Sequence, residues 1–163
     1  MKYLNSLIAM SILSFSAHAQ ESREEWSKEF KKPNTNIESV TQEIAGGFNQ
    51  NKGKKMDSVT LALGATAVKR NINVDYQVTT QLGEAQIEKM KVGVLKVTGA
   101  QTCGLPILFV LVKEHGVTVS YRYFDQNMKQ FLGNVVDANS CKWYEKNISF
   151  TCRMSTFYKR ASV

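Results

Sequence analysis

The first nineteen residues constrain the fold most, because they have the order of a segment that is removed before the chain folds. Lys2 supplies a positive charge, residues 7–15 form a short apolar core, and Ala17-His18-Ala19 places small residues where a signal peptidase cuts. A membrane-spanning helix needs about 20 apolar residues, and this core is shorter. We therefore expect cleavage between Ala19 and Gln20 and export of an unanchored protein to the bacterial periplasm, or further out to the medium.

The expected mature chain is one domain with a modest positive charge. Removing 19 of the 163 residues leaves 144, which is enough to close a single hydrophobic core. We divide the sequence into a signal peptide (1–19), a charged N-terminal arm (20–34) and a single domain (35–163). Cleavage lowers the net charge from +7 to +6. A basic excess of this size suits an anionic partner, and it equally suits solubility without any partner.

Helical spacing predicts three helical segments after the arm. The first begins at Thr35 with a capping-box pattern and ends near a pair of glycines. Residues 84–98 give the second. Residues 106–115 give the third, with proline at its start and glycine after its end; a buried strand is the alternative for this apolar run, and the punctuation favours a helix. The arm at 20–34 fits either a short amphipathic helical turn or a mobile segment.

A period of two predicts two β-hairpins and a fifth strand. The runs, in chain order, are 59–63, 72–78, 117–124, 131–135 and 148–152. We expect Val59, Leu61 and Leu63 to share the buried face of their strand, and a turn near residues 145–147. Tyr121 and Tyr123 share another face, where core packing is the simpler interpretation. Together the patterns predict an α+β fold: one antiparallel sheet packed on helices.

The three cysteines indicate a disulfide. Cys103, Cys141 and Cys152 all follow the expected cleavage point, and in an oxidising compartment two of them should be bridged. The third is then either buried or bonded to another chain. No Cys-x-x-Cys occurs, so thioredoxin-like redox chemistry has no motif here.

A pattern of short motifs resembles one found in small exported proteins of Gram-negative bacteria, most of them uncharacterised. The motifs are Tyr76-x-Val78, Cys103, Gly116-Val117, Tyr121-x-Tyr123-x-Asp125 and Cys141. The resemblance covers residues 56–141. It implies a β-β-α-β-β core with Cys103 bridged to Cys141, and it carries no activity across. Cys152 departs from that two-cysteine pattern, so a Cys141–Cys152 bridge is the competing connectivity.

Residues that could carry catalysis are sparse. His115 is the only histidine after the expected cleavage point, and with Cys103 it makes a thiol–base pair only if Cys103 is reduced. A histidine beside a helix C-terminus commonly has a structural role. One histidine, with cysteines that are not at metal-ligand spacing, does not make a zinc site. We therefore expect no catalytic residue, no metal and no cofactor.

The C-terminal residues combine aromatic and basic side chains more densely than the rest of the chain, so we expect a partner surface there. Its candidate residues are Trp143, Tyr144, Lys146, Arg153, Phe157, Tyr158, Lys159 and Arg160.

These features favour a non-catalytic periplasmic protein that binds another envelope protein. It would be a subunit of an envelope secretion or assembly machine, or an immunity protein against an envelope-acting toxin. One alternative is an exported cysteine-dependent hydrolase that uses Cys103 with His115. Another is a protein that binds lipopolysaccharide or nucleic acid through its basic C-terminal residues.

Overall fold

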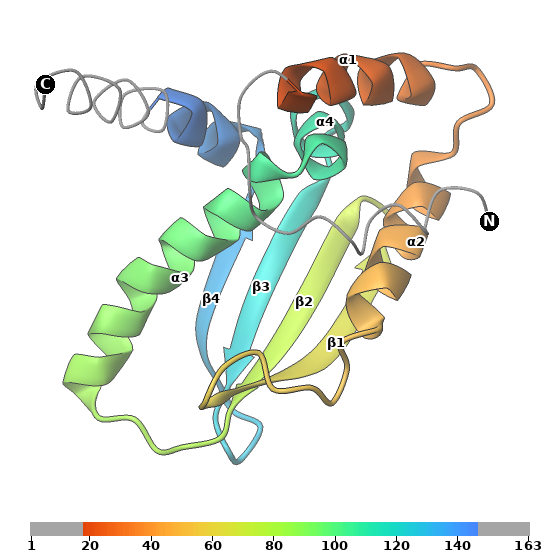
Figure 1. Cartoon of the computed structure of the whole chain (residues 1–163). Helices are drawn as coiled ribbons and strands as arrows, with labels where there is room; N and C mark the ends of the chain where they lie inside the picture. The colour runs from red at the N-terminus through yellow and green to blue at the C-terminus, as the bar shows by residue number, and fades with distance from the viewer. Residues whose placement is uncertain (1–17, 147–163) are drawn as a thin grey trace, which may run out of the picture.

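The computed structural model describes residues 18–146, in which helices pack on one face of a four-stranded sheet (Figure 1). The elements are α1 (His18–Phe30), α2 (Ile37–Asn49), β1 (Thr60–Val68), β2 (Asn71–Val78), α3 (Glu84–Gly104), α4 (Pro106–His115), β3 (Thr118–Phe124), β4 (Gln130–Val136) and a helix over 138–146. The α+β class, with one sheet packed on helices, was predicted from the sequence and is confirmed. Of the two alternatives for residues 20–34, the structure has a helix over most of the segment.

The sheet is mixed, whereas the sequence analysis expected an antiparallel one. Its order is β1-β2-β3-β4, and both predicted hairpins are present as the antiparallel outer pairs. The central pair, β2 and β3, is parallel. The reason lies in the connection: α3 and α4 return the chain to the end of the sheet where β2 began, and a long helical crossover of this kind joins parallel strands.

The first half of β1 faces the opposite way from the prediction. Thr60 and Ala62 are buried, while Leu61 and Leu63 are half-buried. The pairing with β2 shifts between Ala62 and Gly64, so the strand carries a bulge that resets its alternation. Small side chains therefore line the inner face at this point.

Two helix boundaries differ from the predicted ones. Asn36, not Thr35, caps α2: its side chain accepts hydrogen bonds from the backbone N–H groups of Glu38 and Ser39. Thr35 instead donates its hydroxyl to the carbonyl of Glu29. The helix also continues through the two glycines to Asn49, because Asn49 anchors it to the edge of β1: its side-chain amide bonds the N–H and C=O of Ala65 at 2.7 and 2.9 Å.

The apolar run at 107–112 is a helix, as predicted, and it is buried on all sides. Every residue from Ile107 to Val112 is at most 9% exposed, which explains why the run shows no amphipathic pattern. Gly116 ends α4 in the left-handed conformation with φ of 65°. No single helix within residues 18–146 is long and apolar enough to span a membrane; α3 and α4 meet that criterion only together, as a pair bent by 89°.

The segment after β4 is helical over 138–146, where the sequence analysis expected a turn near its end. Asp137 caps the start of this helix: its carboxylate accepts hydrogen bonds from the backbone N–H and the hydroxyl of Ser140. These hydrogen bonds also lower the pKa of Asp137 below its ordinary value. The predicted fifth strand at 148–152 lies outside the described residues.

The core lies between the helices and the inner face of β2 and β3. Tyr76 and Tyr123 are paired across these strands with ring centres 5.2 Å apart, and both are buried. Tyr121 is fully buried and its hydroxyl lies 2.9 Å from that of Thr102 on α3. The prediction that Tyr121 and Tyr123 belong to the core is confirmed.

Candidate partner-binding cleft

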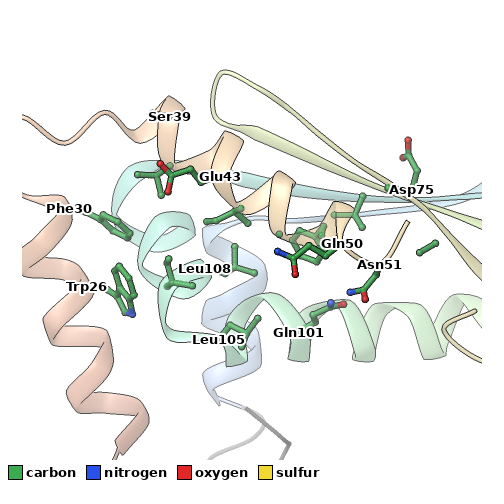
Figure 2. Close-up of a pocket in the computed structure, with 18 of the residues that line it drawn as sticks. Trp26, Phe30, Ser39, Glu43, Gln50, Asn51, Asp75, Gln101, Leu105 and Leu108 are labelled. Carbon is green, nitrogen blue, oxygen red and sulfur yellow. The ribbon is translucent and has the colours of Figure 1, made fainter. Parts of the chain in front are cut away.

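A cleft of about 670 Å³ opens on the helical side of the sheet, between α1 and α2 on one side and the α3–α4 junction on the other (Figure 2). Its floor comes from the inner faces of β1 and β2. Its apolar lining residues are Trp26, Phe30, Val40, Ile44, Phe48, Met56, Ala62, Val74, Tyr76, Leu105, Ile107 and Leu108. A volume of about 300–1,000 Å³ with a mainly apolar lining is usual for a ligand-binding cavity.

The cleft exists because small residues face it from two elements. On β1 the lining residues are Ala62 and Gly64, since the bulge turns the neighbouring leucines away. On α2 the lining includes Gly47, where an added Cβ would meet nothing within 4 Å. Larger residues at these positions would fill the space that α2 and the sheet leave between them.

The α2 wall is only partly covered by the core. Val40, Ile44 and Phe48 follow helical spacing on one face, and each is half-buried. Their inner edges pack against the core, and all three also line the cleft. The helix thus presents an apolar stripe that the rest of the described chain does not cover completely.

The charged residues that line the cleft are close to balanced in sign once their ion pairs are considered. Glu29, Glu43 and Asp75 line it, with Lys54 as the one base among the lining residues. Asp75 is paired with Arg122 at 2.7 Å and Glu29 with Lys32, whereas Glu43 forms no ion pair with any residue in 18–146. Asp75 also alternates along β2 with the buried Val74 and Tyr76, so within residues 18–146 the charges without an ion pair at the cleft are those of Glu43 and Lys54, which are opposite in sign.

Helix α1 closes one end of the cleft with Trp26 and Phe30, while Leu105 lines the cleft from the α3–α4 junction (Figure 2). Trp26 stacks on Phe30 at 5.4 Å, and Phe30 meets the edge of His115 at 5.8 Å. The hydroxyl of Ser27 also donates to Glu114 at 2.8 Å. These contacts fix α1 along α4.

Arg23 ties α1 to the junction of α3 and α4. Its guanidinium lies over the ring of Phe109, donates to the carbonyl of Cys103 at 3.0 Å, and is paired with Glu145 at 3.6 Å. Burial lowers the pKa of Arg23, and the negative charge of Glu145 opposes that shift. The end wall of the cleft therefore depends on one partly buried cation.

A disulfide joins Cys103 to Cys141 beside this junction. The sulfur atoms are 2.06 Å apart and both residues are fully buried. This is the pairing that the sequence resemblance implied; Cys152, the member of the competing pair, lies outside the described residues. The bridge connects the end of α3 to the helix at 138–146, and so it holds the α3–α4 wall of the cleft.

The bridge leaves the proposed cysteine–histidine pair without a nucleophile. Cys103 carries no thiol, and His115 lies at the far end of α4, which at 1.5 Å per residue is about 15 Å long. Burial lowers the pKa of His115. Among residues 18–146, no group of three histidine, cysteine or carboxylate side chains is arranged to hold a metal ion.

The surface predicted from the C-terminal residues is separate from the cleft. Trp143 is 63% exposed, Lys146 is exposed, and Tyr144 is half-buried against Gly99. The remaining predicted residues, which lie outside the described chain, are Arg153, Phe157, Tyr158, Lys159 and Arg160. The sequence analysis missed the cleft; the apolar stripe of α2 next to two glycines was the signal that could have indicated it.

No protein-family model and no curated protein matches the sequence. Three solved structures resemble the fold. PA3611 of Pseudomonas aeruginosa, described as a candidate secreted protein, gives a TM-score of 0.54 at 16% identity over 64% of this chain and 92% of its own. EpsS, a pilotin of the Vibrio vulnificus type 2 secretion system, gives a TM-score of 0.51 at 12% sequence identity, and the match covers 72% of this chain and 96% of the EpsS chain. AspS, a type II secretion pilotin of Vibrio cholerae, gives a TM-score of 0.49 at 14% sequence identity, and the match covers 74% of this chain and 99% of the AspS chain. At these identities the matches to PA3611 and EpsS show a likeness of fold alone.

Proposed function

We propose that this protein is a non-catalytic accessory subunit of an envelope secretion or assembly machine, and that it holds a segment of a partner protein in the cleft between α2 and the α3–α4 junction. The observation that carries the proposal is the cleft itself, which has a volume of about 670 Å³ and a mainly apolar lining.

The chemistry of the cleft selects a class of ligand. Its apolar walls favour a ligand with several apolar groups, because burying them is favourable at about 25 cal/mol per Å². Glu43, which forms no ion pair within residues 18–146, offers a carboxylate to a lysine or arginine on that ligand. A protein segment with alternating apolar and basic residues meets both requirements.

Two further observations support an envelope role. The fold resembles that of EpsS, a pilotin of a type 2 secretion system, over 96% of the EpsS chain. The buried Cys103–Cys141 disulfide suits an oxidising compartment outside the cytoplasm, in agreement with the expected signal peptide. An accessory subunit of this kind would act by binding. The disulfide agrees with such a role, because the sulfur of Cys103 is bonded to Cys141 and is not a free nucleophile.

Two adjacent glycines on α2 allow the proposal to be tested with a matched control. Gly47 lines the cleft and Gly46 does not, and a Cβ added at either meets nothing within 4 Å. Gly47→Phe should therefore fill the cleft, while Gly46→Phe should leave it open. The purified full-length protein would serve as bait in an envelope extract from its own source, and captured proteins would be identified by mass spectrometry.

A partner that binds wild type and Gly46→Phe equally, and Gly47→Phe at least ten-fold less, would support the proposal. Its direct interaction should then be measured with the purified partner by calorimetry. A partner that binds all three proteins equally would place the interaction elsewhere on the surface. Turnover of a substrate by the purified wild type would contradict the accessory role.

A further inference from the structure

We propose that a second copy of this chain pairs with it along the edge of β4, so that the two sheets join into one. The contact surface, called the β4 flank below, consists of the backbone edge of β4 and the exposed side of α3 that carries Val92 and Leu95. None of these residues lines the cleft, so the contact is independent of the proposed function.

The two edges of the sheet differ in how far their backbone groups are bonded. At the β1 edge, the side chain of Asn49 bonds both backbone groups of Ala65, and the loop at 53–56 bonds the backbone of Thr60 and Ala62. At the β4 edge, no hydrogen bond within residues 18–146 joins the backbone of the strand to any element other than β3. Alternate N–H and C=O groups of an edge strand point away from the sheet, so β4 offers them to another strand.

The sequence of β4 leaves most of this edge unprotected. Edge strands are commonly kept from pairing by a charged side chain or a proline, and residues 130–136 contain neither. A bulge has the same effect, but the irregularity in the pairing with β3 lies at the start of the strand, between Gln130 and Leu132. Residues 132–136 are therefore a regular stretch on which a further strand can pair.

The charges at the two ends of β4 select an antiparallel copy of the same strand as the partner. Lys129 precedes the strand and Asp137 follows it, with no charge between them. When two β4 strands pair antiparallel about Gly133, Lys129 of each copy comes near Asp137 of the other, whereas a parallel arrangement would bring like charges together. A two-fold contact of this kind uses the same patch on both copies and closes at a dimer.

The exposed side of α3 adds apolar surface beside this edge. Val92 and Leu95 lie about one turn apart on one side of the helix and are 55% and 58% exposed. Gly99 continues the same side, and a Cβ added there would lie 3.6 Å from the ring of Tyr144 in the helix that follows β4. This side of α3 is therefore turned toward the β4 end of the sheet, while Gln101, which lines the cleft, lies on a different side of the helix.

The two parts of the β4 flank lie in adjoining layers. Helix α3 packs over β4 (Figure 1), and the side-chain amide of Asn134 donates a hydrogen bond to the hydroxyl of Thr98 at 2.7 Å. Joining two sheets at β4 therefore brings both α3 helices to the same face of the new sheet, one on each side of the junction. A stable interface buries about 800 Å² on each partner, and the apolar side of α3 adds to the area that strand pairing buries.

Analytical ultracentrifugation of the purified protein tests the proposal. The wild type should dimerise as its concentration is raised. Val135→Lys on β4, at a position that is 56% exposed, and Leu95→Lys on α3 each bring two like charges close together across the two-fold axis. Each should therefore weaken the dimer by roughly ten-fold or more.

Two exposed valines outside the β4 flank provide matched controls. Val68 lies on the β1 edge strand and Val97 on another side of α3, and they are 63% and 61% exposed. Val68→Lys and Val97→Lys should dimerise as the wild type does. Equal loss of the dimer in these controls would overturn the proposal, provided that all variants melt in the same cooperative transition as the wild type.

Hydrogen exchange at low and high protein concentration locates the contact without any substitution. In the wild-type dimer the amides of residues 130–136 should exchange more slowly than in the monomer, because their outward N–H groups become bonded, whereas those of residues 60–68 at the other edge should be unchanged. Slower exchange at 60–68 with no change at 130–136 would overturn the proposal.

A wild type that stays monomeric at its highest soluble concentration would overturn the proposal, and so would a dimer that persists in both Val135→Lys and Leu95→Lys. Gly47→Phe, which fills the cleft, should dimerise normally. A monomeric protein with Gly47-dependent partner capture leaves the proposed function standing. A dimer at the β4 flank without any captured partner leaves the present proposal standing and removes the proposed function.

Discussion

The guanidinium carbon of Arg23 lies 3.7 Å from the centre of the Phe109 ring. The same group donates a hydrogen bond to the carbonyl of Cys103, so one side chain of α1 contacts both helices of the opposite cleft wall. A cation over an aromatic face contributes about 0.5–2 kcal/mol, and a hydrogen bond to a charged group about 1.5–3 kcal/mol.

Arg23→Ala should therefore destabilise the protein by about 1–3 kcal/mol and loosen α1 in particular. Relative to wild type, amide hydrogen exchange in Arg23→Ala should become faster in residues 18–30 and should change less in the sheet. Arg23→Lys should restore only part of the stability, because an ammonium group lacks the planar face and paired donors of the guanidinium. Full rescue by lysine would contradict the role assigned to the planar group.

Tyr121 and Thr102 satisfy each other's hydroxyl groups in the core. Tyr121→Phe leaves the buried hydroxyl of Thr102 without this partner, which should cost about 1–3 kcal/mol in chemical denaturation. Removing both hydroxyls, in Tyr121→Phe with Thr102→Val, should cost less than the sum of the single changes. Additive losses would show that the two hydroxyls do not interact.

The disulfide should contribute about 2–5 kcal/mol to folding stability. Replacing Cys103 and Cys141 together by alanine should lower the melting temperature and make it insensitive to reductant. Cys152→Ser is the matched control, and its melting temperature should still fall when a reductant is added. If Cys152→Ser abolished the response to reductant instead, the stabilising bridge would involve Cys152.

Stability should fall as the pH decreases through the titration range of His115. Burial lowers its folded-state pKa below the ordinary value of 6.5, so the unfolded chain binds the proton first, and this contribution is fully present only above about pH 7.5. The charged groups around it are Glu114, Arg70 and Lys31. Denaturation at pH 7.5 and 5.5 should show the loss, and His115→Gln should reduce it. An unchanged pH dependence in His115→Gln would assign the effect to other groups.

Two glycine-to-alanine changes should have opposite effects. Gly64 has φ of +123°, and a Cβ there would lie 2.5 Å from the side-chain oxygen of Asn49, so Gly64→Ala should cost about 1–3 kcal/mol. Gly46 is in the interior of α2 with open space around it, so Gly46→Ala should stabilise by about 0.5–1 kcal/mol. Thermal unfolding should show a lower melting temperature than wild type for Gly64→Ala and a higher one for Gly46→Ala.

The sequence predicted those elements whose signals are local. The boundaries of α4 follow from Pro106 and Gly116, and both hairpins follow from alternation, because caps and period-two patterns depend on neighbours in the chain. The direction of β3 relative to β2 was predicted wrongly. It depends on where the crossover helices pack, and no residue in either strand specifies that.

The cleft depends on the β-bulge in β1, which the alternation of apolar and polar residues does not predict. Leu61 and Leu63 are the larger side chains of their strand, and a pattern of hydrophobicity assigns them to the interior. The bulge at Gly64 instead turns Ala62 inward, because Asn49 of α2 takes the edge hydrogen bonds of Ala65. The two hydrogen bonds between Asn49 and Ala65 are long-range contacts, and a single sequence does not reveal them.

The parallel pairing of β2 with β3 makes the two hairpins dependent on each other. Each has one strand that lies at the centre of the sheet only when the other hairpin is in place, and Ile72 meets Val119 only after α3 and α4 have formed between them. Closing so long a loop is costly before its contacts form. Neither half should persist as a separately stable piece, and the protein should unfold as a single cooperative unit.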